Sequence, residues 1–348
     1  MIRIAVDLLG ADTSEEELCS GALDALKENE ELSVILYGHE EKLLPLISEM
    51  GTDTDRVSIV DCKGTVTNFD SSITAYTQSE ASVCRAMKDA SKRADVYGVV
   101  TCGSTGAVLV SSIMILGKIK GMRPVLAVEL KNRDGLPLLL LDCGANIDVR
   151  AELFVTFAHI GDSYMKSIGY ASPRISLLSN GAEDTKGCES VKEANKLLRA
   201  ESEKSGVSLN FIGNIEATDA LCGSTDVIVC DGFHGNIMLK CIEGTAKAAL
   251  DEATVRLASA VNEICKNAEN CEFTDNMKDA FSDAIARVRR KYDYNTQGGA
   301  VLIGANKPVM KGHGSATGEA VKNMLNRIYT LAKNNFVGKI RDIYNENV

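Results

Sequence analysis

Short runs of Val, Ile and Leu alternate along the chain with longer amphipathic stretches. Strands that are buried on both faces of a parallel sheet are nearly continuous in these residues, and helices between such strands cover the two faces. The alternation therefore predicts a doubly wound, mostly parallel α/β sheet. Thr13 and Glu16 fit a capping box at the start of the first helix. We expect strands at 2–9, 32–38, 57–62, 96–102, 126–130, 137–143, 174–179, 209–213 and 226–232.

The segment 244–292 departs from this pattern because it contains no strand-like run. Apolar residues recur at helical spacing in two stretches, which begin near Leu250 and Met277, and the polar sequence KNAENCEFTD separates them. We expect an antiparallel helix pair here that projects from the sheet. A short β pair and a final helix should follow. No linker or internal repeat divides the chain, so residues 1–348 should form a single domain, with 244–292 as a helical hairpin subregion.

Composition excludes several classes of protein. The chain has 48 acidic and 38 basic residues, for a net charge of −10, whereas a general nucleic-acid-binding protein needs a positive surface. Its aliphatic runs are too short to span a bilayer, and its N-terminus lacks the layout of a signal peptide. We therefore expect a cytoplasmic protein whose membrane contact is weak or absent. The eleven cysteines form no CxxC pair and the four histidines lack zinc-like spacing, so we expect reduced thiols and no metal or other cofactor.

Four clusters of glycine and polar residues follow predicted strands. Ligands of parallel α/β sheets bind at the carboxyl ends of strands, where glycines admit backbone amides and helix N-termini favour anions. Any one cluster could be only a turn, and Ser104 could simply cap a helix. Together, however, the four suggest an anion-binding cleft. The residues are Gly103, Ser104, Thr105 and Gly106; Asp142, Gly144 and Asn146; Gly181, Lys186 and Gly187; and Asp231, Gly232, His234, Gly235 and Asn236.

The C-terminal sequence KGHGSA places Lys311 and His313 next to Gly312 and Gly314, and Ser315 can cap the helix that follows. This stretch could be a helix N-terminus with a surface lysine, or it could add a cation to the predicted cleft.

In their order and spacing, these stretches resemble the PlsX family of phosphate acyltransferases along most of the chain. The resemblance implies a homodimer with an α/β fold related to the isocitrate dehydrogenase and phosphotransacetylase architectures. It also implies transfer of an acyl group from acyl-carrier protein to inorganic phosphate, and the acyl phosphate would feed phospholipid synthesis. The matching stretches are IAVDLLGAD, which contains Asp7, and CGSTGA, LLDCGAN, NGAEDTKG, LNFIGNIEATD, VCDGFHGNIMLK, YDYNTQGGAVLIG and KGHGSA.

Such a reaction needs little beyond positioning. A thioester is activated by its thiol leaving group, whose pKa is about 8.5, and phosphate can attack the carbonyl itself. By the resemblance, Lys186 would be the cation at phosphate or at the oxyanion, and Asn236 an orienting amide. Lys311 and His313 are second choices, and Asp231 is expected to position other groups. The remaining cluster residues and Asp7 would bind substrate or phosphate. The rival mechanism is a covalent route through Cys102, Cys143 or Cys230.

Two other functions remain open at this stage. The chain could use a short-chain acyl-coenzyme A, with changed residues at 63–80 forming the thioester pocket, or it could be a non-catalytic paralogue that binds acyl-carrier protein or lipid. A dehydrogenase has less support, because the chain has no dinucleotide glycine fingerprint.

Two surface features of the segment 244–292 suggest partners. Acyl-carrier proteins are acidic, so RVRRK, with Arg287, Arg289 and Arg290, could dock one, although it could also be a solvated helix end. The apolar stripes of the helix pair are expected to pack against a second copy of the chain.

Overall fold

The computed structural model describes residues 1–49, 51, 54–66, 77, 80–204, 209–266, 271–293 and 298–345. Within these ranges, the description of 264–266, 271–275, 277 and 343–345 covers the backbone alone.

The predicted α/β sheet is confirmed, and its strands form one sheet in the order β3-β2-β1-β4-β11-β10-β5-β6-β9-β7-β8. Most neighbouring strands run parallel, as expected for aliphatic strands that are covered on both faces. The strands are β1 (Ile2–Asp7), β2 (Leu32–Gly38), β3 (Val57–Asp61), β4 (Val96–Thr101), β5 (Val125–Lys131), β6 (Pro137–Leu141), β7 (Arg174–Leu178), β8 (Asn210–Ile215), β9 (Val227–Val229), β10 (Ala300–Ile303) and β11 (Val309–Lys311).

The sheet contains two parallel blocks that run in opposite directions. The first block is β3-β2-β1-β4-β11, and the second is β6-β9-β7-β8. Three antiparallel pairings, β11 with β10, β10 with β5 and β5 with β6, reverse the direction between them. The carboxyl ends of the two blocks therefore lie at opposite edges. The cluster after β4 therefore lies at one edge and the clusters after β6, β7 and β9 lie at the other, whereas the sequence suggested one anion-binding cleft.

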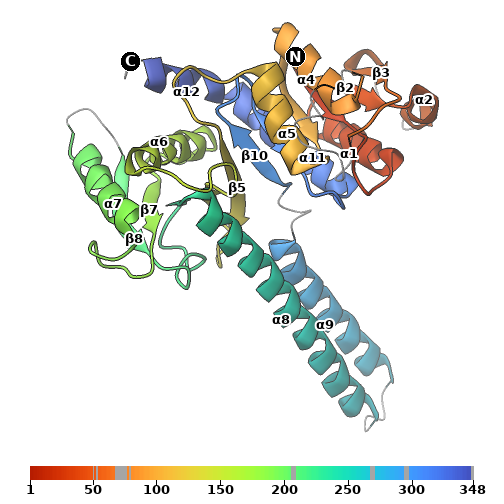
Figure 1. Cartoon of the computed structure of the whole chain (residues 1–348). Helices are drawn as coiled ribbons and strands as arrows, with labels where there is room; N and C mark the ends of the chain where they lie inside the picture. The colour runs from red at the N-terminus through yellow and green to blue at the C-terminus, as the bar shows by residue number, and fades with distance from the viewer. Residues whose placement is uncertain are drawn as a thin grey trace.

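Helices lie against the sheet (Figure 1), and two hydrophobic layers pack between them and its two faces. One layer includes Leu18, Phe154 and Met324, and the other includes Met87, Ala107 and Leu239. The helices of the first layer are α1 (Glu15–Glu28), α2 (Glu40–Glu49), α6 (Ala151–Ser167), α7 (Glu189–Ser202), α11 (Gly318–Lys333) and α12 (Phe336–Asn345); those of the second are α4 (Ser82–Lys92), α5 (Thr105–Ser111) and the first turns of α8 (Gly232–Lys266).

The ends of two helices differ from the prediction. Ser14, not Thr13, is the N-cap of α1, and its side chain accepts a hydrogen bond from the amide of Glu17. At α11 the N-cap is Thr317, so Ser315 precedes the helix instead of capping it.

The helix pair projects from the body as α8 and α9 (Cys271–Tyr292), which lie side by side (Figure 1). Its first helix begins at Gly232, twelve residues before the expected start, because the cluster after β9 leads directly into the helix. The tip was expected to be a turn throughout, but the backbone is helical from Cys271. Residues 267–270 and the side chain of Phe273 lie outside the described part, so the predicted polarity of the tip stays a prediction.

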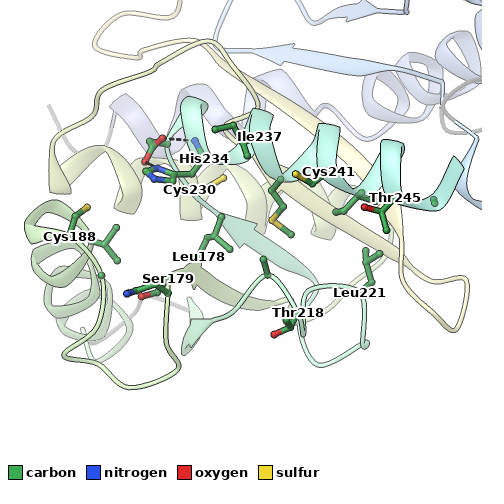
Figure 2. Close-up of a pocket in the computed structure, with 18 of the residues that line it drawn as sticks. Leu178, Ser179, Cys188, Thr218, Leu221, Cys230, His234, Ile237, Cys241 and Thr245 are labelled. Carbon is green, nitrogen blue, oxygen red and sulfur yellow. Dashed lines mark hydrogen bonds and ion pairs between the residues drawn. The ribbon is translucent and has the colours of Figure 1, made fainter. Parts of the chain in front are cut away.

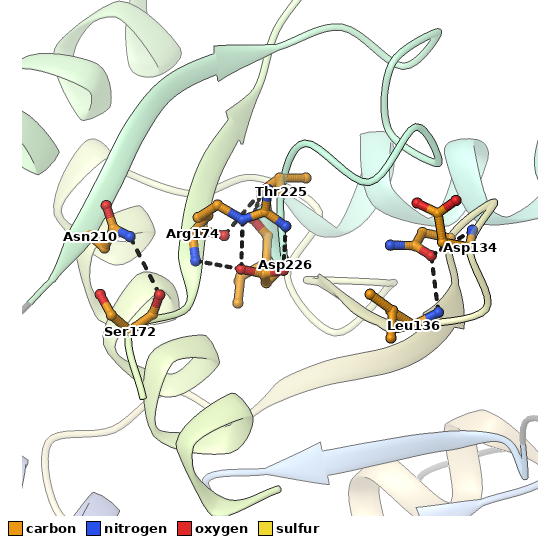
Figure 3. A network of polar contacts seen from close by, with 9 residues as sticks. Asp134, Leu136, Ser172, Arg174, Asn210, Thr225 and Asp226 are labelled. Carbon is orange, nitrogen blue, oxygen red and sulfur yellow. Dashed lines mark hydrogen bonds and ion pairs between the residues drawn. The ribbon is translucent and has the colours of Figure 1, made fainter. Parts of the chain in front are cut away.

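A charged clamp fixes the start of the second block (Figure 3). Arg174 Nε and Nη2 donate to the two carboxylate oxygens of Asp226 at 3.0 and 2.8 Å, and the Arg174 amide donates to Oδ2 at 2.8 Å. Thr225 Oγ1 also donates to the Arg174 carbonyl at 3.1 Å. These bonds stand one residue before the paired positions Ile175 and Val227. They hold β7 and β9 in register, so the carboxyl ends of the two strands are fixed relative to each other.

Candidate active site

Each parallel block has a point where its connections diverge to opposite faces. In the first block, β1 is followed by α1 on one face, whereas α4 on the other face precedes β4. In the second block, β7 is followed by α7 on one face and β9 by α8 on the other. Open α/β sheets bind ligands at such points. The predicted residues fall at both, so the structure offers two candidate regions, with α8 passing between them.

The first region contains a buried acid at the ends of β1 and β4. Thr101 Oγ1 donates to Asp7 Oδ2 at 2.7 Å, and the Leu9 amide donates to Oδ1 at 3.2 Å. Burial raises the pKa of Asp7 to about 6. The Gly103 amide donates to Thr101 Oγ1, so the predicted loop Gly103–Ser104–Thr105–Gly106 begins directly beside this pair. Ser104 is the N-cap residue of α5, and its side chain makes no capping hydrogen bond.

Cations lie near the same edge. Lys311 ends β11 opposite Thr101. Burial lowers the pKa of its ammonium, and the positive charge of Lys240 on α8 lowers it further. His313 Nδ1 lies 2.8 Å from Ser315 Oγ. A polar cleft of about 440 Å³ opens here between this loop and the base of the helix pair. Its lining includes Glu243, Lys247, Leu250, Tyr292, His313 and Ser315.

The second region is an apolar groove of about 1130 Å³ at the ends of β7 and β9. Figure 2 shows side chains from the loops after β7 and β8 facing the side chains that α8 presents. Most of the lining is aliphatic or small. Residues that line it include Phe154, Leu178, Val191, Ala217, Leu221, Ile237, Met238, Cys241, Thr245, Ala246, Ala249, Leu250 and Tyr292.

One end of the groove is polar and holds an oriented histidine. Asp231 Oδ1 accepts hydrogen bonds from the amides of Phe233 and His234, which caps α8, and Oδ2 lies 2.6 Å from His234 Nδ1. The ring of His234 lines the groove. Because Asp231 holds Nδ1, Nε2 is the ring nitrogen available to a substrate. Asp231 thus fixes the orientation of the His234 ring in this structure.

The loop between β7 and α7 supplies the rest of this end. Ser179, Asn180, Gly187 and Cys188 line it, and Cys188 is the N-cap of α7 with no side-chain capping bond. Gly187 has a φ of +104°, and a Cβ there would lie 2.5 Å from Val191 Cγ1. Ser179 Oγ is buried and has no hydrogen-bond partner among the described residues. A helix N-terminus, a glycine and a buried hydroxyl thus adjoin the histidine, and this is a suitable setting for an anion.

Several predicted binding residues instead form the junction behind this site. The carboxylate of Asp142 accepts from the amides of Leu126, Gly144, Ala145 and Asn146 and from Asn146 Nδ2. A Cβ at Gly235 would lie 1.9 Å from the Asp142 carbonyl, and one at Gly232 would lie 2.7 Å from that of Asn146. The geometry therefore favours a structural role for Asp142, Asn146, Gly232 and Gly235, which let α8 pack against the loop after β6.

The two first-choice catalytic residues lie beside the groove but do not line it. The exposed Lys186 stands in the loop after β7, with its side chain against Gly181, and its neighbour Gly187 reaches the lining. The exposed Asn236 lies on α8, with its Oδ1 4.0 Å from where a Cβ on Gly144 would stand. On α9, Arg287, Arg289 and Arg290 are all exposed, and Arg289 Nη2 donates to Asp251 Oδ1 of α8 at 2.8 Å.

The cysteines that could have supported a covalent route are poor nucleophiles. Cys102, Cys143 and Cys230 are buried, and burial raises the pKa of the Cys102 thiol to about 12 and that of the other two well above the ordinary range. A buried thiol of this kind is inert, because the thiolate is the reactive form. Exposed Cys241 in the groove was not singled out from the sequence. The feature of the sequence that could have identified it is the recurrence of the small residues Cys241, Thr245 and Ala249 on one face of a predicted helix.

Within the described ranges, no group of three His, Cys, Asp or Glu side chains is arranged to hold a metal ion. No helix in that part of the chain combines the length and apolar character needed to cross a bilayer.

The fold is that of the phosphotransacetylase class of α/β proteins. A phosphotransacetylase from Streptococcus pyogenes superposes with a TM-score of 0.61 at 16% identity, covering 95% of this chain and 94% of its own. The EutD phosphotransacetylase from Staphylococcus aureus superposes with a TM-score of 0.59, also at 16% identity, with coverage of 95% and 94%.

Sequence similarity identifies the family. A family model described as "Fatty acid synthesis protein" matches residues 2–339. A protein from Lysinibacillus sphaericus named "Phosphate acyltransferase" is 36% identical over 350 residues, covering 98% of each chain. A protein of the same name from Shouchella clausii is 36% identical over 336 residues, covering 96% of this chain and 95% of its own. The chain belongs to this family of fatty acid synthesis proteins, the PlsX family, as its motifs indicated.

Proposed function

We propose that the chain transfers an acyl group from a thioester to inorganic phosphate and releases an acyl phosphate and a thiol. The observation that carries this proposal is the apolar groove, whose polar end combines the His234–Asp231 pair with the N-terminus of α7. An acyl chain fits the apolar part, and its thioester carbonyl then lies at the polar end. The printed name of the relatives, phosphate acyltransferase, supports the same reaction.

In this mechanism a phosphate oxygen attacks the thioester carbonyl carbon, a C–O bond forms and the C–S bond breaks. His234 Nε2 accepts a proton from the attacking phosphate and returns it to the departing thiolate, while Asp231 keeps the ring oriented. The backbone amides at the start of α7 bind phosphate, and Lys186 neutralises charge on phosphate or on the tetrahedral oxyanion. Asn236 is proposed to orient the donor from the opposite flank of α8.

The first region offers an alternative place for phosphate. The candidate phosphate ligands there are the cation Lys311 and the polar side chain of His313, and the loop Gly103–Gly106 lies beside them. The neighbouring Asp7 opposes an anion once it is ionised. We therefore assign phosphate to the second region. Loss of Lys186 or of Lys311 distinguishes the two assignments, as argued below.

The family resemblance extends the proposal to partners. The donor would be acyl-carrier protein or acyl-coenzyme A, and the product would serve phospholipid synthesis. The nine cysteines with described side chains are all free, which suits the reducing cytoplasm. We also propose a homodimer that forms through the helix pair, where Val255, Phe281 and Val288 are exposed apolar side chains.

A second candidate is a short-chain acyl-coenzyme A phosphotransacylase, which the structural likeness to phosphotransacetylases favours. The large groove favours a longer acyl group. Residues 67–76 and 78–79, where a new pocket was considered, lie outside the described part. A non-catalytic paralogue is the third possibility.

The test is loss of thioester with acyl-carrier protein and coenzyme A donors side by side, with and without phosphate. Phosphorus NMR detects the acyl phosphate directly. We expect thiol release and acyl phosphate in equal amounts, and only with phosphate. Thiol release without phosphate would show a thioesterase, and no turnover with either donor would indicate the non-catalytic alternative.

A further inference from the structure

We propose that the groove along α8 limits the length of the acyl chain that can bind, and that Thr245, Ala249, Leu250 and Tyr292 set the upper limit. This inference rests on the proposed function, because it places the reacting thioester at His234. It concerns a different property, namely which chain lengths the groove accepts.

The groove follows a single stripe of α8. The lining residues His234, Met238, Cys241, Thr245 and Ala249 recur at intervals of three or four, so they share one face of the helix. The helix rises about 1.5 Å per residue, so the distance from His234 to Leu250 is about 24 Å. An extended acyl chain advances about 1.25 Å per carbon, because its single bonds are about 1.5 Å long and tetrahedral. The groove therefore holds roughly 19 carbons.

The distal end has a physical limit. Leu250 and Tyr292 line the groove and also line the polar cleft beside His313, so they stand as a wall between the two spaces. Across this wall, on the side of the polar cleft, lie Glu243, Lys247 and Asp293. A longer chain would have to place methylene groups among charged side chains, where they gain nothing from leaving water. Each methylene inside the groove is worth about fourfold in binding.

An acyl chain suits this space better than a second copy of the chain does. Ala217 and Ala249 are small, and Thr245 and Cys241 leave an open channel between α8 and the loop after β8. Among the larger exposed apolar residues, Ile237 lines the groove, whereas Val255, Phe281 and Val288 do not and remain available to a partner subunit.

Two substitutions at different depths of the groove test whether it limits the length of the acyl chain. Phenylalanine at Thr245 stands about 16 Å from His234 along the helix, and at Ala249 about 22 Å. We expect Thr245→Phe to lower kcat/KM for 16-carbon donors at least 30-fold while 10-carbon donors keep their wild-type rate. Ala249→Phe should affect 18-carbon donors and spare 14-carbon ones. Ala248→Phe is the matched control, because Ala248 is exposed on the same turn and does not line the groove.

A second measurement reports occupancy without turnover. Cys241 is exposed in the groove about 10 Å from His234, whereas Cys222 is exposed outside it. Hexadecanoate should slow alkylation of Cys241 by N-ethylmaleimide at least fivefold and leave Cys222 unchanged, as followed by mass spectrometry. Hexanoate should protect neither thiol. Thr245→Phe should abolish protection by hexadecanoate and retain protection by decanoate.

The two measurements separate failure of this inference from failure of the proposed function. Protection of Cys241 that depends on fatty-acid length, without any phosphate-dependent turnover, would support the chain-length limit and refute the transferase function. If turnover depends on acyl-chain length in the same way in the wild type, Thr245→Phe and Ala249→Phe, the chain-length limit is refuted and the transferase function stands. Protection of Cys241 that rises with protein concentration in the absence of fatty acid would mean that a second copy fills the groove, and would overturn the inference.

Discussion

His234 Nδ1 lies 2.6 Å from Asp231 Oδ2, and the other oxygen of the same carboxylate accepts the two amides that begin α8. One side chain thus caps the helix and orients the imidazole. Asp231→Asn can keep an oxygen at the cap, but its amide donates to Nδ1 and moves the ring proton to Nε2. We expect kcat to fall roughly a hundredfold or more, the scale of lost acid–base catalysis, with little change in the melting temperature.

Two further variants separate the cap from the chemistry. His234→Gln should lose kcat to a similar degree and leave the cap intact, whereas Asp231→Ala should in addition cost about 1 kcal/mol in the free energy of unfolding. Normal kcat in His234→Gln would remove the histidine from the mechanism.

Lys186 distinguishes the two assignments of phosphate. We expect Lys186→Ala to lower kcat roughly a hundredfold, the scale of a lost oxyanion contact, and to raise the KM for phosphate. Asn236→Ala should lower kcat to a comparable degree. Lys311→Ala should leave the KM for phosphate unchanged. Lys196→Ala on a later turn of α7 is the control, since Lys196 is exposed and pairs only with Glu193 in the described contacts. A raised phosphate KM in Lys311→Ala, with an unchanged one in Lys186→Ala, would move phosphate to the first region.

Much of the fold follows from local patterns in the sequence. Runs such as Val34–Leu36 and Leu138–Leu141 are fully buried strands, because aliphatic residues satisfy both covered faces of the sheet. The direction of the blocks could not be predicted in the same way. It depends on β10 pairing with β5, which lies far from it in the chain, and the aliphatic runs carry no signal for parallel or antiparallel pairing.

The site was predictable residue by residue but not as an arrangement. Motifs identified Asp231 and His234 and the loop near Gly187, because these follow strands. The same reasoning placed Asp142 among the ligand-binding residues, although its oxygens accept backbone amides of its own loop. A carboxylate that closes a turn and one that binds substrate have the same sequence pattern, and only the tertiary contacts separate them. The groove likewise arises from loops that meet α8 across long sequence separations.

Asp7 predicts an unusual dependence of stability on pH. Burial raises its pKa from 3.8 to about 6, so its stabilising contribution is complete below pH 3.8 and is lost as the pH rises through 6. Asp7→Asn mimics the neutral acid. We expect it to increase the free energy of unfolding at pH 8 by up to about 3 kcal/mol and to leave that at pH 3.5 nearly unchanged. Urea unfolding at both pH values measures this, and equal changes at both would contradict the raised pKa.

The dimer makes a simple prediction about the helix pair. Val255 and Val288 are 62% and 45% exposed, and a two-fold partner would cover them. Sedimentation at micromolar concentration should give a dimer for the wild type and a monomer for Val255→Asp combined with Val288→Asp. Secondary structure by circular dichroism should be unchanged in the double variant. A monomeric wild type would refute the proposed assembly.

Docking of an acidic acyl-carrier protein should depend on the basic face of α9. Arg289 already pairs with Asp251 across the helix pair, so its reversal would disturb the hairpin itself. Arg287 and Arg290 are exposed and suit the test better. We expect Arg287→Glu with Arg290→Glu to raise the KM of an acyl-carrier-protein donor about tenfold, because charges at an interface rim steer encounter, and to leave that of an acyl-coenzyme A donor within twofold. Arg256→Glu is the matched control, as Arg256 is exposed on α8 away from this face. Equal effects on the two donors would reject docking at this face, and flotation of the protein with anionic vesicles would contradict the expected weak membrane contact.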